Sequence, residues 1–140
     1  MTTQPQAVEA IYQKFVDGWN DAAIYTLEGE KFDSSKDVPH GSPYVRVSVR
    51  HTGGTQHTLG KRGNRKFERS GSVFVQVFVP SGEGVFDSGT LAQAARAIFE
   101  GEDIPGTTVF FQDVVIRETG PSGKWLQTVV EASFQYTETK

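Results

Sequence analysis

The peptide Lys66-Phe-Glu-Arg-Ser-Gly-Ser-Val-Phe-Val-Gln-Val-Phe-Val-Pro80 decides the fold of this 140-residue chain. From residue 73 to residue 79 valine occupies every odd position, and Phe74 and Phe78 lie at even positions. Because side chains alternate along a strand, both faces of this segment are apolar. A strand buried on both faces belongs in the middle of a sheet, so we predict a central strand over residues 66–79 that Pro80 ends. Gly71 predicts a bulge or a close approach by another backbone.

Other segments predict the strands beside it. Residues 44–50 alternate between valine and polar residues, and the short apolar segment 22–27 is a further candidate strand. Residues 107–118 and 124–136 predict a hairpin that residues 119–123 connect. The residues expected to point inward are Val109, Phe111 and Val115 or their alternates, with Leu126, Val130 and Phe134. Since both faces of residues 108–116 are apolar, core packing is one explanation and cover by another subunit is a second.

Two segments have helical periodicity. The first begins near a capping box of Thr3 and Gln6, and its apolar stripe is Val8, Ile11, Tyr12, Phe15, Val16 and Trp19. The second covers residues 87–100 and ends at Gly101, and its stripe is Leu91, Ala94, Ala95, Ile98 and Phe99. We therefore predict an α+β fold: a mixed, mostly antiparallel sheet of four to five strands packed against two helices, in the order α-(β)-β-β-α-β-β.

Length and composition limit the classes of protein. We expect one domain over residues 1–140, with a long surface loop at 28–43 and a flexible basic arm at 51–66. The chain has no cysteine, which excludes disulfides and thiolate chemistry. We expect no membrane span, because no apolar run approaches the roughly 18 residues that cross a bilayer. We also expect no secretion signal, because residues 1–10 have neither a basic nor an apolar region.

Charge is distributed unevenly along the chain. Residues 44–69 hold seven Lys and Arg and one acid, whereas the whole chain has a net charge of −3. Such a molecule can attract its own copies or an oppositely charged partner. The basic candidates for contact are Arg46, Arg50, Lys61, Arg62, Arg65 and Lys66. The acidic candidates are Glu28, Glu30, Asp33, Glu100, Glu102 and Asp103.

The basic arm has two interpretations. Residues 52–64 form either a solvated loop or an arm that projects from the sheet and becomes ordered on assembly. As a contact element it suits protein better than nucleic acid, because it has no aromatic residue to stack on bases.

Residues that could support chemistry do not form a recognisable site. His51 and His57 lack a third ligand nearby, and Asp87 replaces the last glycine of a nucleotide-binding pattern at Gly82-Glu-Gly84. Asp113 and Glu131 could pair across the last hairpin, but spacing alone assigns them no catalytic role. We expect no catalytic residue, metal or cofactor.

The order and spacing of several segments are similar to the phage tail-terminator-like proteins. The resemblance rests on the stretch from Pro43 to Val49, on Arg62-Gly-Asn-Arg65 leading into residues 69–80, on Gly82-Glu-Gly84, on residues 92–101, and on 115–130. It covers residues 5–136. Residues 28–37 are acidic and lack the Pro and Trp that the family often has there.

This resemblance implies a structural role in the virion tail, with assembly in the host cytoplasm. Such proteins form a ring, usually a homo-hexamer, that caps the tail tube, stops its growth and meets the head–tail connector. Another phage neck or head-completion protein, and a nucleic-acid-binding module that uses the basic arm, are the alternatives.

Overall fold

The computed structural model describes residues 3–19, 24–27, 43–56, 58–80, 85–122 and 125–139. The predicted loop, with Glu28, Glu30 and Asp33, lies outside these residues apart from its last position. So do His57 and the Gly82-Glu-Gly84 turn.

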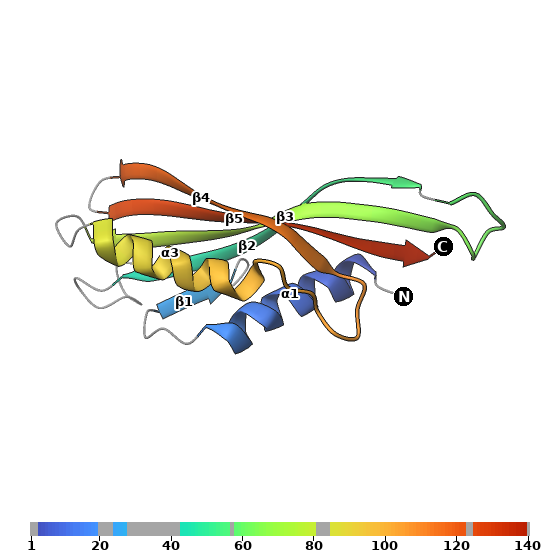
Figure 1. The fold of residues 1–140 in the computed structure, drawn as a ribbon, viewed down its shortest axis with the longest axis horizontal. Helices are drawn as coiled ribbons and strands as arrows, with labels where there is room; N and C mark the ends of the chain where they lie inside the picture. The colour runs from blue at the N-terminus through green and yellow to red at the C-terminus, as the bar shows by residue number, and fades with distance from the viewer. Residues whose placement is uncertain are drawn as a thin grey trace.

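The described elements form one mixed sheet and two helices (Figure 1). In chain order they are α1 (Gln4–Gly18), β1 (Ile24–Leu27), β2 (Tyr44–Gln56), β3 (Lys66–Pro80), α3 (Val85–Phe99), β4 (Phe110–Ser122) and β5 (Trp125–Thr139). The strand order is β1-β2-β3-β5-β4, in which β1 and β2 are parallel and every other pair is antiparallel. The predicted α+β class is confirmed, and β3 is the central strand.

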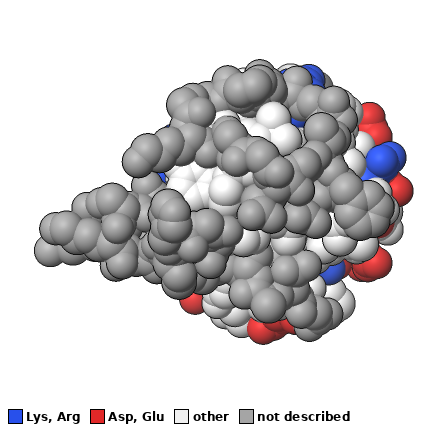
Figure 2. All heavy atoms as spheres, turned by 90° about the vertical axis from the view of Figure 1, so that its left-hand side faces the viewer, with Lys and Arg blue, Asp and Glu red and all other residues white. Residues whose placement is uncertain are grey.

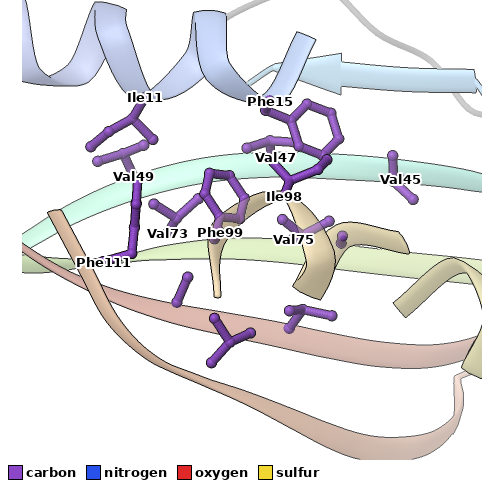
Figure 3. Close-up of a cluster of buried hydrophobic side chains, with 14 of the residues drawn as sticks. Ile11, Phe15, Val45, Val47, Val49, Val73, Val75, Ile98, Phe99 and Phe111 are labelled. Atoms are coloured by element: carbon purple, nitrogen blue, oxygen red, sulfur yellow. The ribbon is translucent and has the colours of Figure 1, made fainter. Parts of the chain in front are cut away.

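Both helices cover the same face of the sheet, and the core lies between them and the strands (Figures 1 and 3). The odd-numbered valines of β3 are buried there, with Ile11 and Phe15 of α1 and Phe99 of α3. Phe99 lies 4.9 Å from Phe111, measured between ring centroids. The apolar stripes of the helices and the alternation of the strands therefore meet in one layer.

The start of α1 and the end of α3 follow the sequence, whereas α3 begins at Val85, two residues before its predicted start. The hydroxyl of Thr3 accepts a hydrogen bond from the backbone N–H of Gln6, and the Gln6 side chain accepts one from the backbone N–H of Thr3. This reciprocal pair is the predicted capping box, which satisfies two N–H groups at the start of α1. Gly101 has φ of +70°, so the residue after α3 adopts the left-handed conformation expected of a C-terminal glycine.

The ribbon of β2 and β3 is longer than predicted. Pairing continues past Arg50 to Gln56, which lies opposite Phe67, with a shift in register between His51 and Gly53. A Cβ atom at Gly71, opposite His51, would overlap the carbonyl oxygen of Arg50 and the ring of Phe134. The predicted close approach at Gly71 is therefore confirmed, and the connection between the strands shortens to residues 57–65.

A bulge in β4 overturns one inward assignment. Phe111 pairs with Phe134 and Val114 pairs with Ala132, so β4 has one extra residue between these pairs. Because the bulge changes the alternation, Phe111 and Val114 are both buried, whereas Val115 turns outward and is 40% exposed. The expectation that Val115 points inward is wrong for this reason.

The second face of the sheet carries no described helix. It presents the even-numbered side chains of β3 with Arg46 and Arg50 of β2, and on β4 the outward Val115 and Phe110. Phe74 and Phe78 are half-buried there. We call this surface the open face.

Phe110 and Phe111 are adjacent in the sequence but lie on opposite faces of the sheet, so substituting each of them tests the assignment of the faces. Phe111 is 4% exposed and packs on Phe99 and Phe134, whereas Phe110 is 42% exposed. We expect Phe111→Ala to lower the free energy of unfolding by about 3–5 kcal/mol, because it leaves a cavity in the core. Phe110→Ala, the matched control, should lower it by less than about 1 kcal/mol. Urea titration followed by circular dichroism measures both, and equal losses would contradict the assignment of faces.

Candidate assembly surfaces

The six basic candidates lie in two places. Arg46 and Arg50 are exposed on the open face of β2, whereas Lys61, Arg62, Arg65 and Lys66 lie at the far end of the β2–β3 ribbon. We call residues 58–66 the arm tip; it projects beyond both helices (Figure 1). The structure therefore does not bring the cations into one patch.

The arm tip is a closed turn. The backbone N–H of Thr58 donates to the carbonyl of Lys66 at 3.3 Å, and the backbone N–H of Lys66 donates to the Thr58 hydroxyl at 2.9 Å. Between them the N–H of Asn64 donates to the carbonyl of Lys61 at 2.9 Å, and Gly63 has φ of +99°. None of the four cationic side chains forms an ion pair with another described residue.

Leu59 is the feature of the arm tip that sequence reasoning missed. Its side chain is 94% exposed, more than any other large apolar residue that the structure describes. A single leucine among glycines and cations has no periodicity, so no sequence signal separates it from an ordinary loop residue.

The base of the arm is fixed by His51 and Tyr136. The Nε2 atom of His51 lies 2.8 Å from the hydroxyl oxygen of Tyr136, at hydrogen-bond distance. Burial holds the pKa of His51 below its ordinary value, and the Arg69 guanidinium lowers it further. Burial also raises the pKa of the Tyr136 hydroxyl, with Glu138 acting in the same direction and Arg69 against it. His51 therefore joins β2 to β5 at the base of the arm.

The described acidic candidates gather in the turn after α3. Glu100, Glu102 and Asp103 are all exposed there, in a segment without a base. Glu100 forms an ion pair with Arg96, at 2.5 Å between carboxylate oxygen and Nε. Neither Glu102 nor Asp103 forms an ion pair within the part of the chain that the structure describes. This acidic turn belongs to the helix layer, whereas Arg46 and Arg50 lie across the sheet.

A groove of about 960 Å³ opens between α1 and α3, beside the acidic turn. Its apolar lining includes Ala94, Ala97 and Ile98 of α3 with Ile104 and Pro105. The helices come close because position 18 is glycine: a Cβ atom there would lie 3.0 Å from Cγ1 of Ile98. Sequence reasoning missed this groove, because it depends on the spacing between helices and not on one pattern.

Glu131 does not pair with Asp113. One of its carboxylate oxygens lies 2.5 Å from Nη1 of Arg117, and the other accepts a hydrogen bond from the Ser72 hydroxyl at 3.1 Å. Asp113 falls in the β4 bulge, away from the ladder position opposite Glu131. The suggested pair is therefore replaced by an ion pair on the open face.

Among the described residues there is neither a metal-ligand cluster nor a helix that could span a membrane. No group of three or more His, Asp or Glu is placed to hold a metal ion among them. No described helix has the length and apolar character needed to cross a membrane.

Figure 2 shows the end of the molecule opposite the arm. Described acidic and basic side chains lie next to one another along the right-hand edge of this view.

The His51–Tyr136 contact predicts a pH dependence of stability. A histidine whose pKa is lower in the folded state takes up its proton more readily in the unfolded chain. The free energy of unfolding should therefore fall as pH drops through the ordinary histidine pKa of about 6.5 towards the lower folded value. We expect His51→Gln to show a smaller loss between pH 7 and pH 5 than the wild type, measured by urea unfolding. Equal losses would contradict the assignment.

Comparison with known proteins agrees with the fold. A protein-family model described as phage tail terminator protein matches residues 7–133. Among solved structures 25 chains match, and one of them superposes with a TM-score of 0.66 at 16% sequence identity. That alignment covers 91% of this chain and 94% of the other, and at this identity it shows a shared fold. No curated protein sequence matches the chain.

The family match includes α1 from residue 7 onward, α3, the arm, and all five strands up to residue 133 of β5. The chain therefore belongs to the phage tail terminator family, whose members are structural proteins of the phage tail.

Proposed function

We propose that this chain forms a ring that caps the head-proximal end of the tail tube and stops further tube subunits from adding. The observation that carries the proposal is the arm, which extends past the helix layer with four cations that no described acid neutralises. A projecting, charged element without an internal partner is suited to contact with another polypeptide.

The surfaces of the molecule support a head-to-tail assembly. In a cyclic ring one patch of each subunit meets a different patch of the next. The basic arm and the acidic turn after α3 are two such unlike patches, separated on the molecule. Charge pairing would set the register of neighbouring copies, and apolar contact would supply most of the affinity. A homo-hexamer that meets the tube on one side and the head–tail connector on the other is the assembly that we propose.

The core supports treating residues 1–140 as one domain. One buried cluster joins both helices to β2, β3, β4 and β5. A second apolar surface remains on the open face, where Phe110 and Val115 are exposed. We propose that other tail subunits cover this surface during assembly in the host cytoplasm.

Tail length tests the capping function. In cells that carry the phage with this gene inactivated, electron microscopy should show overlong tails, and wild-type protein supplied from a plasmid should restore normal length. A variant that lacks residues 55–61 should fold but fail to restore it, because the arm is shortened. Tails of normal length detached from heads would instead assign the protein to the neck.

The salt dependence of binding distinguishes a nucleic-acid-binding protein from the proposed tail protein. Each phosphate contact lowers the logarithm of the binding constant by about 0.9 for every tenfold rise in salt concentration, so affinity falls steeply as salt rises. We expect the purified protein to show no such binding to duplex DNA. Tight, salt-sensitive binding that is lost with residues 55–61 would contradict the proposal.

Arg46 and Arg50 test the open face. The double variant Arg46→Glu/Arg50→Glu places negative charge where two exposed cations lie on β2, so capping efficiency should fall at least about tenfold. The matched control Arg46→Lys/Arg50→Lys keeps the charge and should cap normally. Tail-length distributions measure capping, and circular dichroism verifies the fold of both variants. Tails of normal length with the charge-reversed variant would show that capping does not depend on the open face.

A further inference from the structure

An apolar anchor stands at the end of the arm. Leu59 is 94% exposed in a turn that two Thr58–Lys66 hydrogen bonds close. A surface leucine alone needs no explanation, but this one lies on a projecting element and is followed by Lys61 and Arg62. A shaped tip of this kind loses little conformational entropy when it binds, because its backbone is already held.

The groove between α1 and α3 offers the complementary surface. Ala94, Ala97 and Ile98 line one wall, and Ile104 and Pro105 lie at its end. Because Ala94 and Ala97 have small side chains, the groove stays open next to the point where Gly18 contacts Ile98. The groove is large enough to receive a leucine side chain together with part of the turn that carries it.

The charges around the groove match those of the arm tip. Asp17 and Glu102 line the groove with one cation, Lys14, and Asp103 follows Glu102 in the exposed acidic turn. The arm tip holds four cations and no acid. Docking would place Lys61 and Arg62 beside the carboxylates of Asp17 and Glu102, neither of which forms an ion pair with another described residue; Asp17 accepts one hydrogen bond, from the Gln13 amide.

The positions of the two surfaces favour contact between copies. The arm tip lies beyond the N-terminal end of α1, whereas the groove lies between the helices beneath the sheet (Figure 1). Since tip and groove are different surfaces, their contact is heterologous. Repeating this contact from copy to copy generates a ring if the rotation between neighbouring copies brings the last copy back to the first.

We propose that the arm tip of one copy docks in the α1–α3 groove of the next copy, with Leu59 as the apolar anchor. This inference rests on the proposed ring and names the contact that joins its subunits. The partner is therefore a second copy of this chain.

Crosslinking tests the contact directly, because the chain has no native cysteine. Leu59→Cys and Ala97→Cys introduce thiols at two exposed sites, one on the tip and one in the groove. With a short bis-maleimide, the double variant should give a ladder of oligomers on denaturing gels. An equimolar mixture of the two single variants should give only dimers. Leu59→Cys combined with Val115→Cys on the open face is the matched control and should stay uncrosslinked.

Affinity gives a second measurement. Leu59→Ser should weaken self-association at least about tenfold in sedimentation velocity, because burial of the leucine is lost. Leu59→Met, which keeps an apolar side chain of similar size, should retain it. Since Leu59 is exposed in the single chain, neither change should alter the unfolding transition.

Charge reversal shows whether the contact joins different copies. Lys61→Glu and Glu102→Lys should each weaken association of the pure variant, because each brings like charges together. A 1:1 mixture of the two variants should associate again, since every tip then finds an opposite charge in the groove of the other variant.

Each outcome bears on this contact separately from capping. Crosslinks and rescue by mixing support it. If copies associate and cap tubes without crosslinks between the two introduced thiols, the contact is overturned and the proposed function stands. If the wild type stays monomeric at every concentration and no crosslink forms, the contact is also overturned, and tail length alone then decides the capping function.

Discussion

Pairing of β3 with β2 on one side and β5 on the other is the constraint on which the rest of the structure depends. The fifteen residues of β3 pair with β5 along their whole length. The inner half of β3 places Val73, Val75 and Val77 in the core, and the outer half carries the arm. A change in register by one residue would turn those valines to the open face and shift the arm at the same time. The core and the arm are therefore parts of one ladder.

Much of the fold could be predicted because alternation and helical spacing are local signals. Val73 to Val79 predict the central strand, and Thr3 with Gln6 predicts where α1 begins. The departures arise where tertiary contacts outweigh the pattern. The bulge before Val114 has no composition signal, and residues 51–56 lack apolar alternation but pair with β3 all the same. Such polar strands are stabilised by the ladder that they extend, and not by burial of their own side chains.

The candidate site was less predictable than the core. Charge identified the arm and the acidic turn correctly as exposed elements, because Lys, Arg and Glu are rarely buried. The groove depends on how closely α1 and α3 approach, and this distance follows from Gly18 beside Ile98, two residues from different helices. Leu59 shows the converse case, since its exposure depends on how far the ribbon extends. Neither the distance between the helices nor the length of the ribbon can be inferred from local sequence patterns.

The residues that stabilise the fold and the surfaces proposed for assembly lie on different parts of the molecule. The face that the helices cover supplies the buried apolar area, which dominates the free energy of folding. The arm tip and the acidic turn contribute few buried contacts, so they can carry unpaired charge at little cost to the folded chain. In the proposed ring these charges would interact more strongly where two copies meet and water is displaced between them, because electrostatic interactions strengthen as the local dielectric constant falls. A tail protein built in this way can remain folded as a single chain, and under the proposed ring its association would depend on a correctly matched neighbour.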